Sequence, residues 1–146
     1  MITITIDSVN SSEKKGTVKL AVPHITINEN GVEHDAHAGD WHRQVSLLAQ
    51  ESIDKMIQKG LLHLHSGDFA ENITTKNIDL LSLPVGTKVA LGEEVVVEIT
   101  QIGKHCHARC AIYYAAGDCV MPKEGVFAKV ITGGIAQVGA QIKVIE

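Results

Sequence analysis

The stretch VGTKVALGEEVVVEI at residues 85–99 contains two runs of alternating apolar residues, separated by the turn sequence Gly92-Glu93-Glu94. Alternation with a period of two is typical of strands that bury one face. Residues 138–144 repeat the pattern of 85–91, with a glycine turn followed by alternating apolar residues. We therefore predict a sheet of short strands that begin at glycine turns.

Further strands are predicted on both sides of this stretch. Four segments show apolar alternation or runs rich in β-branched residues: 2–6, 18–22, 126–131 and 142–145. The first two suggest a hairpin. Residues 28–40 and 66–76 are mostly polar and contain glycine, so we predict loops there.

One segment, about 41–59, predicts a helix instead. Its apolar residues recur at spacings of three and four, as on one face of an amphipathic helix. Asp40 can cap its N-terminus, and Gly60 suits the position just after its end. The expected fold class is mainly β: a barrel with one clear α-helix at about 41–59 and short helical additions.

The chain has 146 residues, a formal net charge of -4 and three cysteines. This length fits a single domain spanning 1–146, and free thiols suit a reducing cytoplasm. An acidic balance with 3% aromatic residues argues against a nucleic-acid partner. The N-terminus lacks the features of a secretory signal, and no apolar run approaches the ~18 residues of a membrane helix. We therefore expect a cytoplasmic protein with no membrane partner.

The densest cluster of chemically versatile side chains is KHCHARC at 104–110. Four of its members are cationic or can become so: Lys104, His105, His107 and Arg109. Nearby positive charge lowers the pKa of a thiol, and the thiolate is both the nucleophile and the soft-metal ligand. The pattern therefore favours a reactive Cys106 or Cys110. The alternative interpretation is that both are ordinary buried small residues.

Two further interpretations concern the cysteines. Cys119 lies in GDCVMP at 117–122, a pattern typical of a loop, where it is either a functional thiol or a half-buried structural one. A zinc site could use the ligands His105, Cys106, His107 and Cys110. This spacing does not match a zinc finger or ribbon, so zinc remains the weak alternative.

A second candidate site is HDAHAGDWH at 34–42, which is followed by Arg43. These residues precede or begin the predicted helix, and a helix N-terminus offers free N–H groups to an oxyanion or phosphate. We therefore predict an anion or cofactor site at His37, His42 and Arg43. The alternative is a solvated loop whose histidines bond to local backbone groups.

Five segments, taken in order, resemble the MOSC family, named for the C-terminal domain of molybdenum cofactor sulfurases, and above all its small stand-alone bacterial members. They are HAGDWHRQVSLLAQESI (37–53), GDFAENITT (67–75), LPVGTKVALG (83–92), VEITQIGKHCHARCAIY (97–113) and GDCVMPKEGVFAKVITGG (117–134). The resemblance implies a β-barrel that binds molybdenum cofactor or handles sulfur for a metal–sulfur centre. The His-x-Gly of the family falls on His37 and Gly39.

The resemblance implies an accessory protein that binds molybdopterin-type cofactor and carries or transfers sulfur through a cysteine. The catalytic or metal-ligating cysteine would be Cys110, Cys106 or Cys119. The cofactor-binding residues would be His37, Gly39, His42, Arg43, Lys104, His105, His107 and Arg109. A cysteine desulfurase would donate the sulfur and a molybdoenzyme would accept it, and any enzymatic activity would be this transfer. The alternative function is a non-catalytic zinc-binding or partner-binding module.

Overall fold

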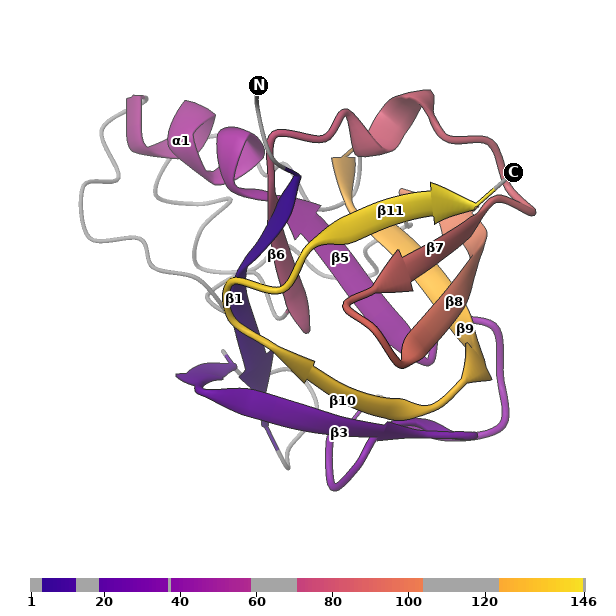
Figure 1. Ribbon diagram of the computed structural model, residues 1–146. Helices are drawn as coiled ribbons and strands as arrows, with labels where there is room; N and C mark the ends of the chain where they lie inside the picture. Colours follow the sequence, from indigo (N-terminus) through magenta and orange to yellow (C-terminus); the bar gives the residue numbers. More distant parts are fainter. Residues whose placement is uncertain (1–3, 13–18, 37, 59–70, 104–123, 146) are drawn as a thin grey trace.

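The computed structural model describes residues 4–12, 19–36, 38–58, 71–103 and 124–145, and this part of the chain is mainly β with one α-helix (Figure 1). The strands are β1 (Thr5–Ser11), β2 (Leu20–Val22), β3 (His24–Asn28), β4 (Gly31–Val32), β5 (Val45–Ala49), β6 (Ile73–Lys76), β7 (Lys88–Leu91), β8 (Val95–Ile102), β9 (Val126–Thr132), β10 (Gly134–Gln137) and β11 (Ile142–Ile145). The helix α1 spans Gln50–Gln58, and the short 3-10 helix η1 spans Leu80–Ser82. The predicted fold class is confirmed as mainly β with a helix.

The strands form an eight-stranded sheet in the order β11-β7-β8-β9-β5-β6-β1-β2 and a three-stranded sheet in the order β10-β3-β4. An isolated bridge between Thr5 and Gln141, and a 2.9 Å hydrogen bond from Ile142 N to Ile4 O, bring the chain before β11 close to β1. Within the described residues, strand pairing does not close either sheet into a barrel. The barrel in the prediction is therefore not confirmed.

The stretch 85–99 forms the predicted hairpin. Strands β7 and β8 pair antiparallel with Leu91 opposite Val95. Gly92 begins the turn with a φ of 85°, a conformation that glycine adopts without strain. The repeated pattern at 138–144 has a structural counterpart, because β11 pairs antiparallel with β7. The two segments that look alike in the sequence are thus neighbours in the sheet.

The predicted helix at 41–59 is wrong in its first half. Residues Val45–Ala49 form β5, and α1 begins only at Gln50. The apolar residues of VSLLA fit helical spacing, but β5 lies between β6 and β9 with both faces covered, so it shows no polar alternation. Pairing with two neighbouring strands therefore overrides the local pattern.

Three other boundaries differ from the prediction. The short strand β4 (Gly31–Val32) lies within the segment 28–40, which was predicted to be a loop. Within the described residues the first strand, β1, spans Thr5–Ser11 and so continues well past the predicted end at residue 6, while residues 2 and 3 lie outside the described part. It pairs with β2 in the expected hairpin. Part of the predicted loop at 66–76 is β6, which lies between β5 and β1. Its β-branched sequence Ile-Thr-Thr is typical of a strand. The polar and glycine residues before it led to the prediction of a loop instead.

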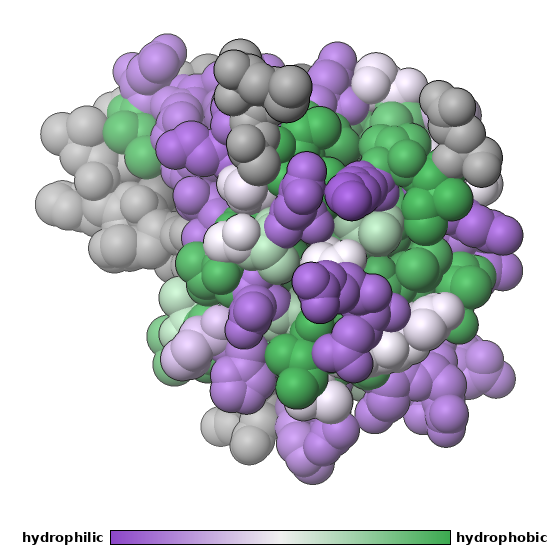
Figure 2. Space-filling view, in the orientation of Figure 1, coloured by the Kyte–Doolittle hydropathy of each residue, from purple (hydrophilic) through white to green (hydrophobic). Residues whose placement is uncertain are grey.

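The large sheet has two different faces. Its inner face is apolar and packs with residues of β3, β4 and β10 into one core: Ile6, Val9, Ile25, Ile27, Val32, Val45, Leu47, Ile73, Val97, Val126, Ala128 and Ala136 are among its members. Ser46 and Leu48 alternate with Val45 and Leu47 along β5, so they point to the opposite, outer face. On the face that Figure 2 shows, apolar side chains lie among polar ones.

Candidate functional site

Three of the predicted site residues lie in the described part of the chain: Gly39, His42 and Arg43. The others lie outside it: His37, Lys104, His105, Cys106, His107, Arg109, Cys110 and Cys119. The described residues occupy the loop 38–44, which leads into β5. The predicted helix N-terminus is not at this loop, because α1 begins at Gln50. The free N–H groups of a helix N-terminus therefore do not explain anion binding at this loop.

The loop 38–44 is held at its end by the amide of Gln44. Its Nε2 donates to Gly39 O at 2.8 Å and to Glu29 O at 2.9 Å. Its Oε1 accepts from Val130 N at 2.8 Å. Because Gln44 is only 5% exposed, these bonds fasten the loop to β9 and to the turn after β3 in a site shielded from water.

His42 connects the loop to the end of β8. Its Nε2 lies 2.8 Å from Gln101 Oε1, and Gln101 Nε2 donates to Gly103 O at 2.7 Å. Thr100 Oγ1 also donates to the carbonyl oxygen of His42. Since Gln101 uses its amide nitrogen on Gly103, its oxygen accepts from His42, which makes Nε2 the protonated ring nitrogen. The exposed ring of His42 is therefore held in one orientation.

The guanidinium of Arg43 lies within cation–π distance of two aromatic rings. Its Cζ lies 4.6 Å from the ring centroid of Trp41 and 5.6 Å from that of Phe127. Its Nε is buried and has no hydrogen-bond partner among the described residues. A guanidinium fixed in this way presents its donors in one plane, which suits a carboxylate, phosphate or other oxyanion.

These groups lie on the outer face of the large sheet. In the strand register, Ser46 is opposite Phe127, and Phe127 is opposite Gln101. The row continues beyond β5 to Asn72, whose Oδ1 accepts from Ser46 N at 3.0 Å and Ser46 Oγ at 3.2 Å. A row of polar and aromatic side chains therefore crosses from β6 to β8 and ends at His42 and Arg43.

The outer face also contains the carboxylate of Glu71. Glu71 is 0% exposed, and its Oε2 accepts from Thr74 Oγ1 at 2.8 Å. Asn10 Nδ2 donates to Glu71 O and to Thr74 Oγ1, both at 3.2 Å. Glu71 thus belongs to a buried network that joins β1 to β6, not to an open reactive site.

The segment that contains the cysteines begins and ends beside this site. Gly103 N donates to Gly125 O at 2.6 Å, and Ile102 pairs with Val126. The residues on either side of 104–123 therefore meet at the end of β8, two positions from Gln101. The structure brings the start and end of the cysteine segment close to His42, whereas the cysteines themselves lie outside the described residues.

Several contributors to the site were not predicted from the sequence: Gln44, Gln101, Phe127 and Asn72. Gln101 is 59 positions from His42 and belongs to no recognisable motif. Only the pairing of distant strands reveals these residues. Phe127 offered the best local signal, because aromatic residues are rare in this chain.

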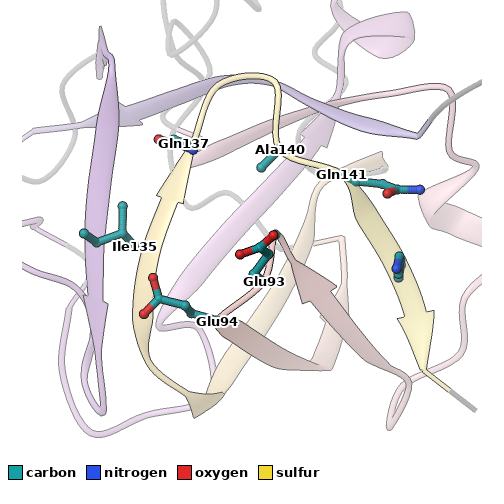
Figure 3. Close-up of a pocket in the computed structure, with 8 residues that line it drawn as sticks. Glu93, Glu94, Ile135, Gln137, Ala140 and Gln141 are labelled. Atoms are coloured by element: carbon teal, nitrogen blue, oxygen red, sulfur yellow. The ribbon is translucent and has the colours of Figure 1, made fainter.

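A separate cavity of about 490 Å³ lies between β10 and the β7–β8 turn, where Glu93 and Glu94 extend towards β10 (Figure 3). None of the predicted site residues lines it. Among the described residues, no group of three or more His, Cys, Asp or Glu side chains could hold a metal ion. The residues named for zinc lie outside the described ranges.

No helix in the described part of the chain is both long and apolar enough to span a membrane.

Comparisons with solved structures show the fold. The YUAD protein from Bacillus subtilis superposes with a TM-score of 0.81 and 15% identity, covering 98% of this chain and 96% of that one. YiiM from Escherichia coli gives a TM-score of 0.70 and 16% identity, with 100% and 71% covered. YiiM from Geobacillus stearothermophilus gives 0.72 and 18%, with 98% and 75% covered. This chain is thus similar in fold to all three.

Comparison at the sequence level shows the family. No curated protein matches the chain significantly. The family model of the MOSC domain, a family associated with molybdenum cofactor-related proteins, matches residues 33–143. This match includes the loop 38–44 and all three cysteines, and it spans well over half of the sequence. The chain therefore belongs to the MOSC domain family.

Proposed function

We propose that this protein binds molybdenum cofactor on the outer face of its large sheet and carries or transfers sulfur through a cysteine. The observation that carries the proposal is the chain of contacts from His42 through Gln101 to Gly103. Residues 104–123 follow directly, so one end of the sheet joins the loop 38–44 to the segment with the three thiols. Membership of the MOSC family supports the same ligand.

Arg43 fits the anionic part of such a ligand. Molybdopterin-type cofactors contain phosphate, and the guanidinium beside Trp41 and Phe127 can bond an oxyanion with two parallel donors. The buried Nε without a described partner is a donor that a bound anion would satisfy once the side chain adjusts. His37, Gly39 and His42 would complete this half of the site, as the family resemblance implies.

The cysteine segment would supply the sulfur chemistry. We assign the reactive thiol to Cys110 or Cys106, with Cys119 as the alternative, and Lys104, His105, His107 and Arg109 would stabilise the thiolate. The thiolate attacks the outer sulfur of a persulfide on a cysteine desulfurase. A sulfur–sulfur bond forms on this protein, the donor's bond breaks, and the donor leaves as a thiolate. A molybdoenzyme would receive the sulfur by the same exchange. Bound molybdenum would accept a thiolate ligand.

Metal and pterin analysis tests the proposal. The protein would be purified without air from a host that makes molybdenum cofactor, together with C106S, C110S and C119S variants. We expect molybdenum and pterin near one per chain in the unaltered protein, and loss of persulfide loading in one serine variant. Zinc without pterin would contradict the proposal and favour the zinc-binding module. Retention of cofactor and persulfide in all three variants would also contradict it.

A further inference from the structure

We propose that the buried ion pair of Lys19 and Asp35 is a positioning device for the loop 38–44. Its effect on ligand binding rests on the proposed function, whereas its effect on the loop does not. The pair links the β1–β2 hairpin to the chain after β4, because Lys19 directly precedes β2 and Asp35 follows β4 by three residues. Lys19 also lies outside the segment that matches the MOSC domain model.

The pair is completely enclosed. Lys19 Nζ lies 2.8 Å from Asp35 Oδ1 and 3.0 Å from Oδ2, and both side chains are 0% exposed. Ser12 N, at the end of β1, donates to Asp35 Oδ1 at 2.9 Å. Ala36 N donates to Ser12 O at 2.7 Å. The Asp35 carboxylate therefore accepts from two separate segments, which fixes both its position and its orientation.

From Asp35 the contacts lead directly into the loop. Asp35 O accepts from Ala38 N at 3.1 Å, and Gly39 N donates to Asn30 O at 2.7 Å. Gln44 fixes the other end of the loop through Gly39 O and Val130 N. The ion pair holds the start of the loop and Gln44 holds its end. Between these two points lie Trp41, His42 and Arg43.

Stability alone does not explain this pair. Removing two charges from water is expensive, and well-packed apolar residues of similar volume usually stabilise a fold as well or better. An enclosed ion pair does restrict the chain to one geometry, since any other leaves a buried charge without its partner. The site of Arg43 needs such restriction, because planar bonding of an oxyanion depends on the guanidinium's orientation.

The test uses the double variant Lys19→Met/Asp35→Leu in the full chain. Both charges are removed together, so no unpaired charge stays buried. The readout is the emission of Trp41, the only tryptophan in the sequence, which lies 4.6 Å from the Arg43 guanidinium. We expect a folded protein whose Trp41 emission shifts to the red and is quenched more readily by acrylamide. The Kd for molybdenum cofactor released from a molybdoenzyme should rise about tenfold or more, as for loss of pre-organisation worth ~1.4 kcal/mol.

The control is Glu98→Gln/Lys129→Gln, which removes an ion pair between β8 and β9 with an N–O distance of 3.5 Å. Its Trp41 emission should not change. If Lys19→Met/Asp35→Leu does not fold, Lys19→Met/Asp35→Asn carries the same test, because asparagine keeps an acceptor for Ser12 N. An unchanged Trp41 emission in the folded variant would overturn the proposal. A shifted emission in a protein that binds no cofactor even when unaltered would support the positioning role and contradict the proposed function.

Discussion

The two faces of the large sheet are both covered, but the outer face buries many polar side chains in addition to apolar ones such as Leu48 and Phe127. The inner face packs valine, leucine and isoleucine into one apolar core. The outer face buries amides, hydroxyls and the carboxylate of Glu71, and it ends at Arg43. A buried polar group destabilises a fold unless each of its atoms is bonded. The difference indicates that the inner face maintains the fold, whereas the outer face maintains a site.

The largest effect on stability is expected from the inner face. Leu47 is 1% exposed in the centre of β5, so Leu47→Ala should lower the free energy of unfolding by about 2–5 kcal/mol, as in other cores. Urea denaturation would measure the loss. Leu47→Met, which conserves volume, should lose less than about 1.5 kcal/mol. Equal losses in the two variants would contradict the account of the inner face as a tightly packed core.

On the outer face, Asn72→Ala should destabilise the fold somewhat less. The change leaves Ser46 N and Asn10 O without the Asn72 amide, and each buried unsatisfied group costs about 1–3 kcal/mol. We expect a loss of about 2–3 kcal/mol, in the lower half of the range of about 2–6 kcal/mol that two such groups span. Asn72→Asp keeps the acceptor for Ser46 N but sets a second acceptor against Asn10 O, so it should not restore the lost stability. A loss larger than that of Leu47→Ala would reverse the proposed roles of the two faces.

At the end of the outer face, Arg43→Met should separate binding from stability. The guanidinium contributes about 0.5–1 kcal/mol through its aromatic contacts, so the free energy of unfolding should change by no more than this amount. Cofactor content after purification should nevertheless fall by about tenfold or more. Arg43→Lys should restore charge but not planar bonding. Full cofactor content in Arg43→Met would remove this residue from the site.

The smallest effect concerns an ion pair that attaches α1 to the chain before β9. Lys55 Nζ lies 2.9 Å from Glu124 Oε1, but the lysine is 61% exposed. Lys55→Ala should cost at most about 1 kcal/mol and less in high salt. Ser52 Oγ donates to the same carboxylate oxygen at 2.8 Å and would hold Glu124 in place. A loss that does not decrease with added salt would contradict an exposed electrostatic contact.

The inner face could be predicted from the sequence far better than the outer face. Alternation at 85–99 predicted β7 and β8 correctly, because one apolar face of a hairpin leaves a local pattern. The segment VSLLA gave a helical pattern, because a strand covered on both faces has no alternation to detect. The row of polar and aromatic side chains on the outer face likewise leaves no local pattern in the sequence. Gln101 and Asn72 become neighbours of the site only when β5, β6, β8 and β9 pair.

For the candidate site, the sequence pattern before the predicted helix pointed to His42 and Arg43, and the resemblance pointed to Gly39. These three residues lie in the loop 38–44, and their roles in binding stay predictions. Anion binding was predicted from a helix N-terminus at this loop. That basis is wrong, because the helix begins at Gln50. Arg43 and its two rings provide a different physical basis for binding an anion. The roles of Cys106, Cys110 and Cys119 stay predictions.

Titration of Trp41 emission with molybdenum cofactor tests the central claim most directly, since this ring contacts the residue assigned to the ligand's anionic group. The unaltered protein should show a saturable change in emission, and Arg43→Met should show none at the same concentrations. Cofactor that co-purifies with the protein while leaving Trp41 emission unchanged would place the ligand elsewhere and contradict the outer-face site.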